Sequence, residues 1–368
     1  MSNLQKSKHY SKFANCIAVK GYLRGIVMDL QRKQYLFVPI NTIGVLEKKS
    51  FCADEFSPEY NKFIDYLEQN EIIFPINKKN VDCFPFFNMD FLTPSIIDNS
   101  IIDADELTLN DVFLFINQLD TLLCNSVQFR FYSKPEKYCL LSILDAINAS
   151  SIESVEILMP EVEWLNDSAL KEFAFNNKKL TSLFFHSAKM DNKNYYNQTT
   201  VTRFVQPIKS FQNCGNVKLG YFYVDIGLTT LSYSYNTCLF KKISIDTHGN
   251  IKNCPSCSQS FGNIKNTTLK QAFEHPDFKK LWSITKDQVD VCKDCEFRHM
   301  CTDCRVYIKD PENIYSQPSK CTYNPYIAKW QGEDGYVPVE ECGTYSREKG
   351  FVVNHERVAE LNDQIWGE

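Results

Sequence analysis

The chain has 368 residues, of which 43% are hydrophobic and 23% are charged, and its formal net charge is −5. This composition is typical of a folded globular protein and excludes a disordered or collagen-like chain. The acidic balance argues against a broad basic surface for nucleic acid. No run approaches the ~20 apolar residues that cross a bilayer, and residues 1–20 lack the apolar core of a signal peptide. We therefore expect a cytoplasmic protein with neither a membrane nor a nucleic acid as its partner.

The length predicts more than one domain, since single cores rarely exceed roughly 250–300 residues. Residues 1–90 predict a small unit of three strands, two helices and a last strand. Residues 16–30 predict a strand, a glycine turn and a second strand, and residues 34–38 predict a third strand that Pro39 ends. Residues 42–48 predict a short helix, a second helix begins after Ser57 and Pro58, and residues 72–75 form the last strand. Strands followed by helices in this order are typical of a winged-helix-like unit.

Residues 91–235 alternate between strand-like and helix-like runs. The expected strands are 95–103, 127–132, 155–159, 180–186 and 218–226, and the expected helices are 109–123, 140–147 and 167–175. Such alternation predicts βαβ units and a mainly parallel sheet, hence an α/β fold. The stretch is shorter than the about 200–250 residues of a complete eight-repeat barrel, so we expect a partial β/α barrel or an open sheet.

Cysteine is the unusual feature of this composition, because eight of the 15 cysteines lie between Cys238 and Cys321. A disulfide scaffold does not suit a chain of this length without an export signal, so the cluster indicates metal binding. Seven cysteines are regularly spaced within residues 236–345: Cys238, Cys254, Cys292, Cys295, Cys301, Cys304 and Cys321. Seven thiolates are too many for one tetrahedral zinc ion, and they suit two iron–sulfur clusters of about four cysteines each.

A structural zinc site remains the alternative, since two Cys-x2-Cys pairs can hold zinc. Here the pairs are only five residues apart, which is closer than the spacing of about 15–20 residues in a zinc ribbon. Beyond the cysteines, residues 346–368 predict a C-terminal amphipathic helix with Val358, Leu361 and Ile365 on its apolar face.

The cysteine spacing resembles that of the SPASM domain, the C-terminal auxiliary-cluster domain of radical SAM peptide-modifying enzymes. Cys238 is followed by ten residues, Gly249, four residues and Cys254, and later by Cys-x2-Cys-x5-Cys from Cys292. The chain departs from the family pattern once, with two residues rather than three between Cys301 and Cys304. The residues around Cys254 and the ranges 292–305 and 323–326 resemble a narrower family, the SPASM-domain peptide maturases of grasp-with-spasm systems.

This resemblance implies two 4Fe-4S clusters and a role beside an ATP-grasp ligase that acts on a short precursor peptide. Cys292, Cys295, Cys301 and Cys321 would hold one cluster, and Cys238, Cys254 and Cys304 would hold the other. In this family a further cysteine can lie six residues before the first cysteine of the pattern. The corresponding position in this chain, six residues before Cys238, is Ser232. Four possibilities therefore stay open for the remaining ligand: Cys257, Cys342, Cys214 and an open iron site.

One element of the radical SAM family is missing from this sequence. Those enzymes carry Cys-x3-Cys-x2-Cys in the loop after the first barrel strand, where the three thiolates leave one iron open for S-adenosylmethionine. Residues 104–108 contain no cysteine, and no such triplet occurs before Cys238. We therefore expect a degenerate radical SAM barrel without adenosyl-radical chemistry. The chain also lacks a P-loop and a glycine-rich dinucleotide fingerprint.

The N-terminal unit has the element order of the precursor-recognition element found in many peptide-maturation systems. In that family a leader peptide adds a strand to an exposed sheet edge, a mode in which main-chain hydrogen bonds supply affinity. We expect one of the runs 26–30 and 35–38 to lie at an edge, with positive charge around it for an acidic leader. That charge comes from Lys20, Arg24, Arg32 and Lys33. A plain capping domain is the alternative.

These observations predict a protein of ribosomal peptide maturation that binds the precursor and carries auxiliary iron–sulfur clusters. Two other functions stay open at this point: an enzyme that uses an open cluster iron, and a non-catalytic scaffold stabilised by zinc.

Overall fold

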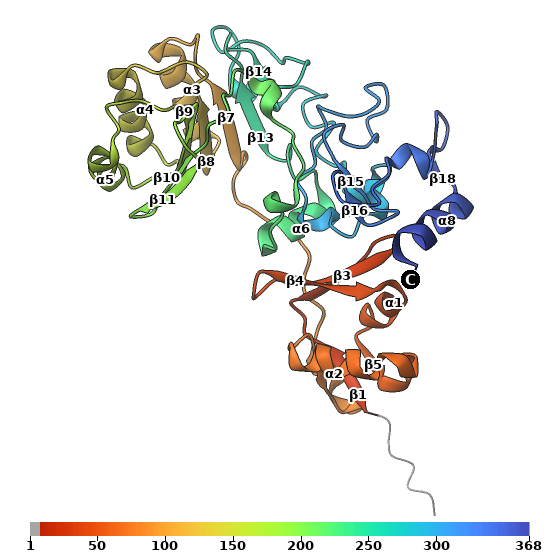
Figure 1. The fold of residues 1–368 in the computed structure, drawn as a ribbon. Coiled ribbons are helices and arrows are strands. Elements are labelled where there is room, and N and C mark those ends of the chain that lie inside the picture. Colours follow the sequence, from red (N-terminus) through yellow and green to blue (C-terminus); the bar gives the residue numbers. More distant parts are fainter. Residues whose placement is uncertain (1–7, 368) are drawn as a thin grey trace, which may run out of the picture. The chain divides into compact units, whose positions relative to one another are not determined.

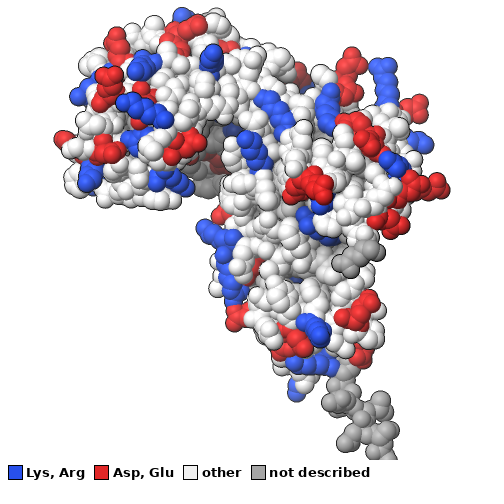
Figure 2. Space-filling view, viewed as in Figure 1, with Lys and Arg blue, Asp and Glu red and all other residues white. Residues whose placement is uncertain are grey.

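The computed structural model describes residues 8–367, which divide into two compact units (Figure 1). The first unit combines residues 1–91, 217–237 and 284–368, and the second combines residues 92–216 and 238–283. The expected absence of a signal peptide from residues 1–20 lies partly outside the described residues. Within residues 8–367, no helix is both long enough and apolar enough to span a membrane. Figure 2 shows acidic and basic side chains interspersed on the face it presents.

The N-terminal part of the first unit contains two small antiparallel sheets. In one sheet β1 (His9–Lys12) lies between β5 (Ser50–Cys52) and β6 (Ile73–Pro75). In the other, β3 (Arg24–Asp29) lies between β2 (Cys16–Lys20) and β4 (Gln34–Pro39). Two helices follow: α1 (Ile43–Leu46) and α2 (Asn61–Gln69). The expected strands and both expected helices are present, and the structure adds β1 and β5, which are too short to stand out in the sequence.

The sheet β2–β3–β4 has apolar side chains on both faces. Val27 on β3 packs against Ile43 and Leu46 of α1. Ile26 and Met28 point to the opposite face, because successive side chains of a strand alternate. That face packs against three side chains of the cysteine-rich segment: Phe297, Met300 and Tyr323. The N-terminal sheet and the cysteine-rich segment therefore share a core within the first unit.

The rest of the first unit contains short elements. These are α6 (Ile226–Ser234), β15 (Tyr323–Asn324), β16 (Lys329–Trp330), β17 (Gly343–Ser346), β18 (Gly350–Val353) and α8 (His355–Trp366). Helix α8 confirms the predicted C-terminal helix, and it buries Val358 and Leu361. The strand predicted at 218–226 is wrong: residues Leu219–Tyr221 form one 3-10 turn, and Asp225 caps α6 by accepting a hydrogen bond from Leu228 N.

The second unit is built on one eight-stranded sheet in the order β11-β12-β10-β9-β8-β7-β13-β14. Its parallel strands are β7 (Asn99–Asp103), β8 (Ser126–Arg130), β9 (Ser154–Pro160), β10 (Leu180–His186), β12 (Thr199–Arg203) and β13 (Lys242–Ile245). Antiparallel strands β11 (Asn192–Tyr196) and β14 (Ile251–Lys252) end the sheet. The helices are α3 (Leu109–Thr121), α4 (Lys137–Ala149), α5 (Asp167–Asn176) and α7 (Leu269–Phe273). The α/β class and the mainly parallel sheet are thus confirmed, as an open partial barrel.

The two faces of this sheet differ in chemistry. On one face, residues that lie opposite one another on neighbouring strands form an apolar row, which includes Ile102, Phe129, Ile157 and Leu183. This row belongs to one apolar core with side chains of α3, α4 and α5, the helices that cover this face in Figure 1. The alternate positions carry polar side chains, and we call that side the polar face. Its main members are Asp103, Gln128, Arg130, Glu156, Lys242 and Ser244. Gln128 donates to Glu156 across two strands at 2.9 Å.

The buried row predicts a large cost for truncating Phe129, which is 0% exposed in the centre of the sheet. Phe129→Ala should lower the free energy of unfolding by about 3–5 kcal/mol, because it removes buried apolar area and leaves a cavity. Urea denaturation followed by circular dichroism measures this change. The matched control is Phe175→Ala, which removes the same side chain from a position that is 64% exposed. Equal destabilisation by both substitutions would contradict the assignment of the core.

Candidate metal centre

Four of the predicted cysteines line one pocket in the first unit. The pocket holds about 340 Å³ of space not filled by atoms, including the part open to solvent, and its sulfur-bearing residues are Cys292, Cys295, Cys301 and Cys321. We call it the four-thiol pocket. Cys292 starts a 3-10 turn, Cys301 follows a second such turn, and Cys321 precedes β15. The structure therefore brings together the four residues that the resemblance assigns to one cluster.

The backbone turns sharply where the pocket begins. Val291 has φ 66°, a left-handed conformation that is a genuine outlier for a β-branched residue and costs on the order of 1–3 kcal/mol. Directly after it, the amide of Cys295 donates to the carbonyl of Cys292 at 3.0 Å. This tight turn lets two thiols that are three residues apart line the same pocket.

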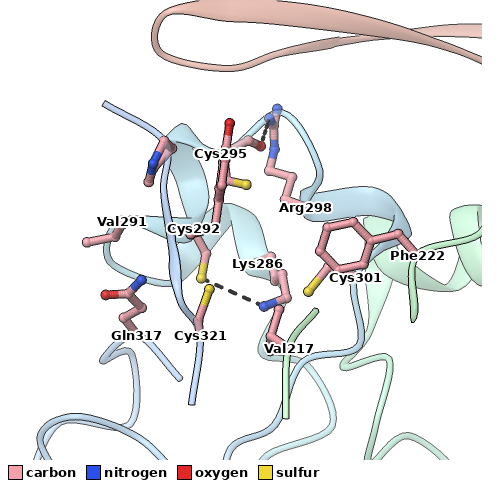
Figure 3. A pocket seen from close by; sticks show the side chains of 12 residues that line it. Val217, Phe222, Lys286, Val291, Cys292, Cys295, Arg298, Cys301, Gln317 and Cys321 are labelled. Carbon is pink, nitrogen blue, oxygen red and sulfur yellow. Dashed lines mark hydrogen bonds between the residues drawn. The ribbon is translucent and has the colours of Figure 1, made fainter. Parts of the chain in front are cut away.

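A buried amine lies among these thiols. The Nζ of Lys286 is 3.7 Å from the Sγ of Cys292 and 3.5 Å from the Oδ1 of Asp303. Figure 3 shows the Lys286 amine facing Cys292 and Cys321, with Cys301 on its other side. Asp303 also contacts the guanidinium of Arg305 at 2.6 Å, as an ion pair that lacks hydrogen-bond alignment. The pocket therefore has a fixed positive charge, held in place by a buried carboxylate.

Burial sets the protonation of these groups. It raises the pKa of the Cys301 thiol to about 12 and that of Cys292 to about 11, although the charge of Lys286 opposes both shifts. Burial alone would lower the pKa of Lys286, but the thiolate forms of Cys292 and Cys301 and the carboxylate of Asp303 raise it well above its ordinary value. Without metal, the thiols of Cys292 and Cys301 are neutral at pH 7 and Lys286 is cationic. Metal loading must displace thiol protons, so it is favoured as the pH rises.

The N-terminal sheet is fastened to the wall of this pocket. Glu296 is buried next to Cys295, and it accepts hydrogen bonds from Arg24 Nε at 2.7 Å and from the Tyr323 hydroxyl at 2.5 Å. The guanidinium of Arg24 lies 3.8 Å from the ring centre of Phe37 on β4. Strands β3 and β4 are therefore connected to the cysteine-rich segment by charge as well as by apolar packing.

The other three predicted ligands lie in different units. Cys304 is buried in the first unit, while Cys238 and Cys254 belong to the second. Within residues 8–367, no three His, Cys, Asp or Glu side chains are gathered closely enough to hold a single metal ion. The four-thiol pocket fits an iron–sulfur cluster by its chemistry, since such clusters are held by about four cysteine thiolates.

Two positions near the second predicted set have other roles in the structure. Ser232, where the family can have a cysteine, donates to the carbonyl of Thr229 at 2.6 Å and contacts His299 Nδ1 at 3.0 Å. His299 itself stacks on the ring of Tyr233 with centroids 3.8 Å apart. Sequence reasoning missed Lys286, and no motif could have identified it, because its role depends on which thiols surround it.

Comparison with known proteins agrees with the cysteine pattern. Residues 237–296 match the family model of the SPASM domain, described as an iron–sulfur cluster-binding domain. Residues 237–296 are therefore similar to an iron–sulfur cluster-binding domain. No curated protein matches the chain.

Two solved structures resemble the chain as a whole. They are Streptococcus suis SuiB bound to S-adenosylmethionine (11% identity, TM-score 0.38, covering 85% of this chain and 99% of that one) and SuiB itself (12%, 0.33, 84% and 99%).

The position of Lys286 predicts an effect on electron transfer. Reduction makes a thiolate-held cluster more negative, so a buried cation beside it favours the reduced form. Lys286→Met should lower the midpoint potential by about 59 mV or more, which corresponds to a tenfold change for one electron. Lys286→Arg should retain most of the native value. Spectroelectrochemical titration of anaerobically purified protein measures both.

The control is Lys293→Met, which removes an exposed lysine that is also next to Cys292. Solvent screens that charge, so its loss should change the potential little. A potential that is insensitive to Lys286 would contradict the electrostatic role. Colourless protein with stoichiometric zinc would contradict the iron–sulfur assignment of the pocket.

Proposed function

We propose that this chain takes part in the maturation of a ribosomally made peptide. In this proposal it binds the leader of the precursor along the edge of β4, carries two 4Fe-4S clusters in the cytoplasm, and works beside an ATP-grasp ligase of a grasp-with-spasm system. It does so without adenosyl-radical chemistry. The observation that carries the proposal is the direct packing of the sheet β2–β3–β4 against the four-thiol pocket.

The edge of that sheet supports peptide binding. Among the described residues β4 pairs only with β3, so its other side presents main-chain groups available for a further strand. Phe37 on β4 is 46% exposed, which leaves an apolar side chain for a bound peptide to cover. The run 26–29 is excluded as an edge, because β3 is the central strand.

The charge expected around this edge is smaller than the sequence suggests. Arg24 is engaged with Glu296, and Arg32 is engaged with Asp29 at 2.8 Å and with Glu71. These carboxylates neutralise two of the four predicted cations. The proposed affinity for a leader therefore depends on main-chain pairing and apolar contact more than on charge.

The start of the second unit supports the absence of adenosyl-radical chemistry. Only residues 104–108 connect β7 to α3, and the side chain of Asp105 accepts hydrogen bonds from the amides of Tyr132 and Ser133 at 2.7 Å. Thr108 then caps α3. This short, tethered loop contains none of the three thiolates that the resemblance requires for binding S-adenosylmethionine. The ATP-grasp ligase enters from the sequence resemblance alone.

Peptide binding can be tested on the full chain with a labelled leader from the precursor encoded beside its gene. Phe37→Glu should weaken binding by about tenfold or more, because it places a desolvated charge at the strand-addition edge. Fluorescence anisotropy measures the affinity. The matched control, Phe84→Glu, changes a phenylalanine that is 45% exposed and lies outside this sheet. Equal effects of the two substitutions would place the peptide elsewhere.

The second test concerns S-adenosylmethionine. Protein reduced with dithionite and incubated with this compound should release no 5′-deoxyadenosine above a boiled control, because the chain has no cysteine in the loop after β7. Liquid chromatography with mass detection measures the product. Multiple turnovers would show that another part of the chain supplies the missing ligands.

A further inference from the structure

A second group of thiols lies within the second unit, on the polar face of its sheet. The Sγ of Cys214 is 4.0 Å from the Nη2 of Arg130, at the carboxyl end of β8. The Sγ of Cys238 is 3.8 Å from the Nζ of Lys242, at the start of β13. Cys254, just after β14, is buried. All five residues belong to the second unit. The sequence pattern assigned Cys238 and Cys254 to a site, and it left Cys214 as one of several candidates.

Electrostatic interactions connect these groups into one cluster. Burial raises the pKa of Cys254, and the charges of Cys238 and Cys214 raise it further, while Lys242 opposes the shift. Cys214 and Cys254 in turn both act on Arg130. Two of the three thiols therefore lie next to a cation, as Cys292 lies next to Lys286 in the first unit.

A buried carboxylate keeps Arg130 on this face. Asp103 on β7 lies opposite Arg130 on the neighbouring strand β8. The Asp103 side chain is completely buried, and within the described residues neither of its carboxylate oxygens has a hydrogen-bond partner. Tyr132 lies nearby but out of hydrogen-bond alignment. A buried carboxylate and a buried guanidinium are costly unless they compensate each other. The carboxylate of Asp103 therefore holds the guanidinium of Arg130 beside Cys214. This cation lies on the polar face and takes no part in the apolar core of the sheet.

The other candidates for the remaining ligand have different surroundings. Cys342 belongs to the first unit and accepts a hydrogen bond from Asn324 Nδ2 at 3.3 Å, inside an apolar cluster. Cys257 packs against the apolar core of the second unit, and its amide donates to the carbonyl of Cys254. Cys214, in contrast, lies beside the guanidinium of Arg130 on the polar face.

We propose that Cys214 is a ligand of a second metal centre, together with Cys238 and Cys254, and that Arg130 and Lys242 balance the charge of its thiolates. The inference rests on the proposed function, because it takes an iron–sulfur cluster as the bound group. Three thiolates from this unit leave one position of a four-cysteine site for a further ligand.

Thiol footprinting of the native protein tests this assignment without any substitution. The anaerobically purified full chain is labelled with iodoacetamide before and after its metal is removed by a chelator and oxidant, and each cysteine is quantified by mass spectrometry. Cys214 and Cys238, which are partly exposed, should both react at least about tenfold faster after removal, because a metal-bound thiolate is protected from alkylation. Partly exposed Cys139 should react equally in both samples.

Two internal references make each outcome decisive. Cys16, which is completely buried in the first unit, reports unfolding if its labelling also increases. Metal-dependent protection of the four-thiol pocket without protection of Cys214 overturns this inference but leaves the proposed function standing. A lack of iron in the purified protein overturns the proposed function itself.

Matched variants provide the second measurement. Cys214→Ser should reduce the iron content to the same extent as Cys254→Ser, by about half if each of two clusters contributes equally. Cys257→Ser is the control and should retain the iron of the native protein. The thermal unfolding profile of each variant checks that the fold is intact. Native iron content in a folded Cys214→Ser protein would exclude Cys214 as a ligand.

Discussion

The first unit depends on the burial of one phenyl ring, that of Phe297, between the N-terminal sheet and the four-thiol pocket. This ring follows Cys295 by two residues and contacts side chains of β3, β4 and β15. The ion pair of Arg24 with the buried Glu296 lies beside it, so apolar packing and charge act at the same place. A proposed peptide edge and a proposed metal centre are thereby parts of one core.

In both candidate centres, positively charged side chains compensate the charge of thiolates, although the residues differ. Buried thiolates are unstable unless positive charge compensates them, because desolvation penalises the charged form. In the first unit Lys286 supplies that charge and Asp303 holds it. On the polar face of the second unit, Arg130 and Lys242 lie next to thiols in the same way. The common arrangement is sulfur beside a cation on a rigid element.

The sequence predicted those features that depend on periodicity and spacing. The alternation of strands and helices from residue 95 to residue 186 produced the parallel sheet, and the Cys-x2-Cys-x5-Cys spacing anticipated three of the four pocket thiols on one loop. The strand expected at 218–226 failed because its apolar residues have no neighbouring strand, and Asp225 starts a helix instead. Lys286 and Arg130 could not be predicted, since a charged residue gains its role only when distant segments surround it.

The interleaving of the two units also constrains how the chain is made. Residues 92–283 contain the whole of the second unit, so it can form while the remainder is still being synthesised. The first unit cannot be completed so early, because Ile26 and Met28 stay uncovered until Phe297 and Met300 emerge more than two hundred residues later. Closing so long a loop is slow, and an apolar sheet face is exposed throughout that interval. Its production in cells should therefore respond to holdase chaperones that shield nascent apolar surface.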